Sequence, residues 1–220
     1  MPQFSLVQKI LLYGIPMLFA ITVHEVAHGW VANRLGDPTA RMLGRLTLNP
    51  IKHIDPIGTI LIPGVLLAIG APFLFGWAKP VPITPQNFKK PRTGMAWVAA
   101  AGPGSNALMA LIWLAVCWIT VLVSSSVPYI RPLYFMGEIG VMVNVVLGVL
   151  NLFPLPPLDG SRVLAGLLPR EGARVLYRIE PYGLFIVAIL LATGVLSWLL
   201  FPIMNAILNL LLGPIPDLPQ

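Results

Sequence analysis

The chain has 220 residues, of which 57% are hydrophobic and only 10% are charged. Soluble domains usually carry about 25% charged residues, so this composition excludes an ordinary soluble domain and indicates an integral membrane protein. Lys and Arg outnumber Asp and Glu by 14 to 8, but the positive charges lie between apolar stretches. They indicate loops on the cytoplasmic side of a membrane rather than a nucleic-acid-binding surface.

The first apolar stretch, residues 4–32, is long enough to cross the hydrocarbon core, which takes about 20 helical residues. Turn-forming residues at 33–38 end it, and a basic segment follows. The second apolar stretch, residues 57–75, is interrupted by Pro63-Gly64 and again at Gly70 and Pro72. Segment 76–93 is basic and rich in proline, which predicts extended or turn-rich backbone rather than helix.

The third stretch, residues 95–123, begins with small residues that let membrane helices approach closely. The fourth, residues 135–153, leads into a proline-broken helix at 151–160. The last, residues 182–212, is too long for one ordinary span, so it forms one long helix or a helical hairpin broken at Gly194 or Pro202. We therefore predict an all-α polytopic membrane protein, a bundle of about five or six membrane helices, as a single domain over residues 1–220.

The first stretch contains His24-Glu25-Val26-Ala27-His28. Residues four apart share one face of a helix, so both imidazoles can bind one metal ion while Glu25 reaches a water as general base. Ionisable side chains inside a membrane span are costly, which favours a functional site. The alternative is a buried polar cluster that holds helices together.

Asp159 is the best candidate for a third ligand, because a catalytic zinc site usually has three protein ligands and one open position. It follows an apolar helix and stands beside helix-breaking prolines and Gly160. Non-helical backbone at membrane depth is tolerated where it faces protein or a watery cavity. The alternative role for Asp159 is to cap a short helix that begins near Ser161.

Three further polar residues are weaker candidates. His53 lies in a basic loop, where it either makes ordinary turn contacts or borders the mouth of the site. Asn106 and Asn151 lie in apolar surroundings and need hydrogen-bond partners. Each either donates to a substrate carbonyl or oxyanion, or ties helices together.

A shared metal also constrains the topology. His28 lies near the end of the first span and Asp159 near the end of the fourth stretch, so the two helices must run in the same direction. If every stretch crossed the membrane they would run in opposite directions. We therefore predict that residues 57–75 form a re-entrant hairpin or otherwise fail to cross. The basic segments 34–52, 76–93 and 161–178 then all lie on the cytoplasmic side, and the metal lies toward that side.

Taken together, these motifs resemble the site-2 protease family of intramembrane metalloproteases, peptidase family M50. The resemblance rests on the His-Glu-x-x-His motif, on Ala101-Gly-Pro-Gly-Ser-Asn106, and on residues 151–160, within a catalytic core of about 14–165. It implies one zinc ion held by His24, His28 and Asp159, with Glu25 catalytic. It also implies that Asn151 helps to position the substrate, and that the substrates are membrane proteins cut within or next to a transmembrane segment.

We accordingly expect a zinc metalloendopeptidase in the lipid bilayer of a prokaryotic plasma membrane, with C-terminal membrane helices over 182–212 and no nucleic-acid partner. Three alternatives stay open: a transporter with polar residues along an ion path, a non-catalytic family member that binds membrane proteins, and another divalent ion in place of zinc. The sequence does not specify the substrate or the oligomeric state.

Overall fold

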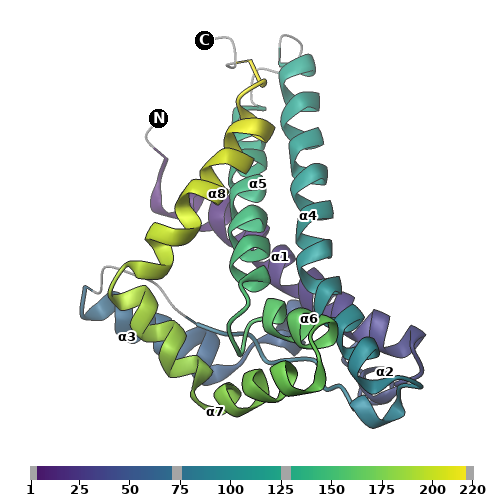
Figure 1. The fold of residues 1–220 in the computed structure, drawn as a ribbon. Helices are drawn as coiled ribbons and strands as arrows, with labels where there is room; N and C mark the ends of the chain where they lie inside the picture. The colour runs from purple at the N-terminus through teal and green to yellow at the C-terminus, as the bar shows by residue number, and fades with distance from the viewer. Residues whose placement is uncertain (1–3, 71–75, 125–129, 217–220) are drawn as a thin grey trace.

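The computed structural model describes residues 4–70, 76–124 and 130–216, and within these ranges the chain forms helices and no strand (Figure 1). Five helices are long and apolar enough to cross a membrane: α1 (Leu6–Arg34), α4 (Pro91–Val123), α5 (Arg131–Leu152), α7 (Arg170–Ala192) and α8 (Val195–Leu212). The shorter elements are α2 (Thr39–Met42), η1 (Pro50–His53), η2 (Pro56–Leu61), α3 (Ile62–Ala68), η3 (Pro85–Asn87) and α6 (Asp159–Leu167). The prediction of an all-α polytopic membrane protein is confirmed.

Helices α1, α4 and α5 pack together and carry the polar cluster described below. Figure 1 shows α1 and α5 descending in the same direction toward α6, whereas α4 rises beside α5 in the opposite direction. If His28 near the end of α1 and Asp159 just after α5 are to bind the same metal, the two helices must run in the same direction, as they do. The turn after α5 lies where the sequence predicts a helix break, because α5 ends at Leu152 and α6 begins at Asp159.

Small residues allow α4 and α5 to approach closely. A Cβ atom added to Gly137 would lie 2.5 Å from Sγ of Cys117, and one added to Gly140 would overlap the ring of Trp113. Beyond the second contact, Ala110 of α4 and Val141 of α5 belong to one buried apolar cluster. In a membrane such close packing supplies much of the attraction between helices, since lipid is as apolar as the side chains.

In its described residues, the second apolar stretch forms no helix long enough to cross a membrane. Elements η2 and α3 follow one another directly, with six and seven residues, and together they extend about 20 Å at about 1.5 Å per residue, which is too short for a hydrocarbon core of about 30 Å. The backbone N–H of Trp77 donates to the carbonyl of Gly58 at 3.1 Å, so the chain returns to the place where the stretch began. A re-entrant segment enters and leaves the membrane on the same side, so its two ends lie close together, as Gly58 and Trp77 do.

The predicted break at Pro63-Gly64 is wrong, because α3 runs through both residues to Ala68. Helix α3, which contains Pro63, follows η2 without a gap, and the carbonyl of Gly58, five residues before Pro63, accepts instead from the N–H of Trp77. The remaining part of the predicted hairpin, residues 71–75, lies outside the described residues. Of the segment 76–93 predicted to be extended or turn-rich, residues 76–84 are non-helical, whereas η3 is a short 3-10 helix and α4 already begins at Pro91.

The last apolar stretch forms two helices, which decides between the two alternatives. Helix α7 ends at Ala192, and Gly194 adopts a left-handed conformation with φ of 75° before α8 begins. Glycine adopts positive φ without the steric cost that a side chain brings. Pro202, the other candidate break, lies within α8 without ending it.

Asp37 joins the end of α1 to the segment before η3. The carboxylate is fully buried and accepts hydrogen bonds from Thr39 N and Oγ1, Thr84 N and Asn87 Nδ2. Burial alone would raise the pKa of Asp37, but these hydrogen bonds lower it below its ordinary value. The non-helical segment that follows residue 76 is thereby held against α1.

Candidate active site

The two histidines of α1 face each other across one helical turn. Their Nε2 atoms are 3.0 Å apart, and their rings stand nearly perpendicular at 88°. Both side chains are buried. The four-residue spacing therefore brings two potential ligand atoms together, as the helical period predicts.

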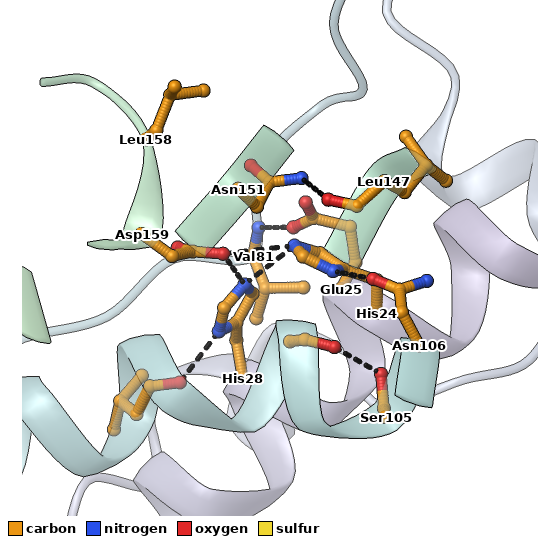
Figure 2. A network of polar contacts seen from close by, with 12 residues as sticks. His24, Glu25, His28, Val81, Ser105, Asn106, Leu147, Asn151, Leu158 and Asp159 are labelled. Atoms are coloured by element: carbon orange, nitrogen blue, oxygen red, sulfur yellow. Dashed lines mark hydrogen bonds and ion pairs between the residues drawn. The ribbon is translucent and has the colours of Figure 1, made fainter. Parts of the chain in front are cut away.

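Each imidazole is held by its other nitrogen (Figure 2). His24 Nδ1 is 2.6 Å from Oδ1 of Asn106, and His28 Nδ1 is 2.7 Å from the carbonyl oxygen of Val98, both on α4. Because these oxygens only accept hydrogen bonds, each ring must donate from Nδ1. The Nε2 atom of each ring then carries a lone pair that points toward the centre of the cluster.

Asp159 completes a triangle of ligand atoms. Its Oδ2 atom lies 3.2 Å from Nε2 of His24 and 3.3 Å from Nε2 of His28 (Figure 2). Gly160 packs so tightly on the end of α5 that a Cβ there would overlap the carbonyl of Leu152. The start of α6 is thus fixed against α5, with Asp159 directed at the histidines.

This triangle fits a metal ion. Because both Nδ1 atoms donate elsewhere, the two Nε2 atoms and Asp159 Oδ2 face one another with lone pairs and no proton between them. Asp159 Oδ2 is also a buried atom with no hydrogen-bond partner. Such an arrangement needs a cation. Two ligands about 2.0–2.1 Å from zinc and at a tetrahedral angle are about 3.3–3.4 Å apart, close to the observed separations. Within the described ranges these three residues form the one group suited to holding a metal.

Glu25 is held next to this triangle by a backbone amide. Its Oε2 atom accepts a hydrogen bond of 2.9 Å from the N–H of Val81 (Figure 2). In the run Pro80-Val81-Pro82, only Val81 carries an N–H, and the flanking prolines restrict the backbone to extended conformations. The extended segment around Val81 therefore offers one backbone donor, and that donor orients the carboxylate of Glu25.

The close approach of α4 to the histidines depends on Gly102. A Cβ added here would lie 2.5 Å from Cε1 of both His24 and His28. The predicted small-residue stretch therefore serves the cluster directly, because it lets α4 reach the imidazoles. Gly102 belongs to the Ala101–Asn106 motif, but its contact with the histidines is not evident from the sequence. Val81 is not singled out by the sequence at all, since it acts through a contact with a distant segment.

The weaker candidates lie in three different settings. Asn106 is fully buried, and its Nδ2 donates to Asn144 Oδ1 at 3.0 Å, so its amide ties α4 to α1 and α5 rather than facing a substrate. Asn151 donates from Nδ2 to the carbonyl of Leu147 at 2.9 Å, on its own helix. His53 is buried on η1, where its Nε2 donates to the carbonyl of Thr47 at 2.9 Å, and it is not part of the ligand group.

Asn144 was missed by the sequence analysis. It lies inside α5, where its Nδ2 donates to the carbonyl of Gly140 at 2.8 Å while its Oδ1 accepts from Asn106. The chain His24–Asn106–Asn144 thus crosses three helices. An asparagine within an apolar span is a signal that could have identified it, because a buried amide needs partners.

Comparisons with known proteins agree on one family. Residues 119–194 match the family described as Peptidase family M50. A Bacillus subtilis protein with the printed name "Putative zinc metalloprotease YwhC" is 41% identical over 194 residues, which cover 87% of this chain and 85% of that protein. A Mycolicibacterium smegmatis protein, "Putative zinc metalloprotease Rip2", is 30% identical over 82% of this chain and 66% of its own length.

The Rip2 protein of Mycobacterium tuberculosis is 27% identical over 82% of this chain and 67% of its own length. No solved structure gives a significant match. The match to YwhC covers most of both proteins. The chain belongs to peptidase family M50.

Proposed function

We propose that the chain is an intramembrane zinc metalloprotease that hydrolyses peptide bonds within or next to transmembrane segments of membrane proteins. The observation that carries this proposal is the convergence of three lone-pair atoms, separated by 3.0–3.3 Å, beside Glu25 in a bundle of membrane-length helices. The names of YwhC and Rip2 support the metal and the reaction.

In this proposal His24, His28 and Asp159 hold one zinc ion per chain. When bound, zinc lowers the pKa of water to about 7 and polarises a peptide carbonyl. Asn106 and the Val98 carbonyl keep both imidazoles in the tautomer that offers Nε2 to the metal. One ion per chain is supported by the single suitable ligand group in the described part of the chain.

Glu25 acts as the general base. Its Oε2 atom is engaged by the Val81 amide, which leaves Oε1 to take a proton from the attacking water and to pass it to the leaving amine.

Asn151 helps to position the substrate: its Nδ2 is bound to Leu147, so its side-chain oxygen is the group that accepts from a substrate N–H. A substrate helix must unwind before cleavage, and we expect glycine or proline near the cut site.

The active site lies toward the cytoplasmic face of a bacterial plasma membrane, within one protease domain over residues 1–220 whose catalytic core spans about 14–165. The three basic segments support this orientation. Single cysteines at Met42 and Lys89, in a Cys117→Ala background, should react with a membrane-impermeant thiol reagent only from the cytoplasmic side. A cysteine at Ser124, at the other end of α4, should react from the opposite side. Labelling of Met42 and Lys89 from opposite faces would contradict the topology.

The function is tested with purified protein, zinc quantification and a panel of transmembrane-helix substrates. Glu25→Gln should retain zinc and lose cleavage, whereas Asp159→Ala should lose both. Glu171→Gln, which removes an exposed carboxylate at the start of α7, serves as the control and should behave like the wild type. Wild-type protein that binds no zinc and cleaves no substrate would overturn the proposal, and undiminished cleavage by Glu25→Gln would overturn the role of Glu25.

A further inference from the structure

A second hollow lies outside the metal cluster, where the end of α1 meets the start of α4. It has a volume of about 370 Å³. Arg34 contributes from the last turn of α1, Lys89 and Lys90 from the residues just before α4, and Thr93 and Trp97 from the first turns of α4. Neither the proposed catalytic machinery nor the helix packing accounts for this collection of groups.

The hollow is strongly basic. Arg34, Lys89 and Lys90 are exposed, and none of them forms an ion pair within the described ranges. Asp37, the acidic residue closest in sequence to Arg34, is fully buried, and its carboxylate is occupied by the hydrogen bonds described above. The positive charge of the hollow is therefore left for a ligand to neutralise.

The backbone at the start of α4 adds to this charge. Lys90 is the N-cap of the helix and provides no side-chain hydrogen bond to the first turn. The N-terminus of a long helix carries partial positive charge, and its free N–H groups favour an anion. This contribution reinforces the three cationic side chains, which are the main attraction.

Exposed indole rings indicate where the hollow lies relative to the membrane. Trp97 lines it and is 64% exposed, and Trp30, one turn before Arg34, is 53% exposed. The guanidinium of Arg34 stacks 4.9 Å from the centre of the Trp30 ring. Tryptophan side chains gather at the level of the lipid headgroups, and both α1 and α4 change from apolar to basic at this point.

We propose that this hollow binds the phosphate headgroup of an anionic phospholipid from the surrounding bilayer. Arg34, Lys89 and Lys90 contact the phosphate and a second anionic or hydroxyl group, while Trp97 packs against the glycerol and the first methylene groups. A phospholipid is favoured over a soluble anion, because one wall of the hollow is an exposed indole that a free phosphate would leave in water.

The lipid would also hold together the two helices that form the metal cluster. Trp97 lines the hollow, and its neighbour Val98 accepts the hydrogen bond from His28. A ligand that bridges Arg34 of α1 to the start of α4 therefore stabilises the contact on which His28 depends. Binding itself does not rely on the proposed protease activity.

The proposal is tested by native mass spectrometry of the purified full chain, titrated with phosphatidylglycerol or phosphatidylcholine. Each basic residue near an anionic lipid surface strengthens binding by about fivefold, so we expect at least about a tenfold preference for phosphatidylglycerol. The variant Arg34→Gln/Lys89→Gln/Lys90→Gln should lose this preference. The control Arg170→Gln/Arg174→Gln/Arg178→Gln removes the same charge from α7 and should keep it.

The far-UV circular dichroism spectrum of each variant reports whether the helical fold is intact. Trp97→Ala provides a second variant, which leaves every charge in place and should weaken phosphatidylglycerol binding severalfold. Equal affinity of the wild type for both lipids would overturn the proposal, as would equal loss in the α7 control. Displacement of the lipid by millimolar inorganic phosphate would overturn the choice of a lipid and assign the hollow to a soluble anion.

Discussion

Replacing Gly102 with alanine would test how closely α4 must approach the two histidines. The added Cβ would lie 2.5 Å from Cε1 of both rings and from Nε2 of His28, whereas ordinary contact begins at 3.4 Å. The rings or the helix must therefore move apart by about 0.9 Å. Ligand distances in metal sites vary by only about 0.2 Å, so this displacement is several times what the site tolerates.

We expect the zinc affinity of Gly102→Ala to fall by at least about 100-fold, the upper end of what changes around metal ligands usually cost. Overpacking of this kind costs about 1–3 kcal/mol of stability. The better helix propensity of alanine offsets about 1 kcal/mol of that. The protein should therefore remain folded while its metal site is lost.

The measurement is competition for zinc against a fluorescent chelator at pH 7, with thermal unfolding of the metal-free protein recorded in parallel. Gly104→Ala is the matched control, because it makes the same chemical change two residues further along α4, where a Cβ would meet nothing within 4 Å. It should leave zinc affinity unchanged. Wild-type affinity in Gly102→Ala would refute the close packing of α4 on the imidazoles, and equal loss in both variants would point to a general effect on the helix.

Three further predictions follow from single contacts. Val81→Pro removes the N–H bound by Glu25, so turnover should fall about tenfold with zinc content unchanged, whereas Val81→Ala keeps the amide and should keep its turnover. Asn106→Leu removes the acceptor for His24 Nδ1, and chelator competition should show zinc affinity lowered about 10–100-fold. Because hydrogen bonds lower the pKa of Asp37 below its ordinary 3.8, its stabilisation is present above about pH 4 and is lost as pH falls through the lowered pKa. Thermal unfolding should therefore show Asp37→Asn less stable than the wild type at pH 7, with the difference narrowing below pH 4.

The features that the sequence predicts well are those with a local physical origin. The spacing of His24 and His28 on one helix follows from 3.6 residues per turn, and the break before Asp159 follows from the prolines at 154, 156 and 157. The common direction of α1 and α5 follows from requiring His28 and Asp159 to meet. The short stretch that begins at residue 57 must then turn back without crossing. The hydrogen bond from Trp77 to Gly58, which joins the two ends of this stretch, agrees with that prediction.

Apart from the meeting of the two histidines with Asp159, contacts between distant segments were decided by the tertiary structure alone. The sequence left Asn106 open between substrate binding and helix packing, and its contacts with His24 and Asn144 favour packing. It gave no sign that Val81 would donate to Glu25 or that Gly102 would lie against the imidazoles. It also predicted a break at Pro63-Gly64 that does not occur, because the helix continues from η2 through Pro63 while the Gly58 carbonyl accepts from Trp77 instead.

The physical reason lies in the solvent. In water, an amphipathic pattern reveals which face of a helix is buried, but lipid is as apolar as a protein core, so lipid-facing and buried residues of a membrane helix look alike in sequence. Gly102 and Gly104 illustrate this, since they stand two residues apart in the same small-residue stretch, one against the histidines and the other with nothing near. The sequence determined where the apolar stretches lie and which ionisable side chains they carry, and the packing of α1, α4 and α5 decided which of the other side chains meet.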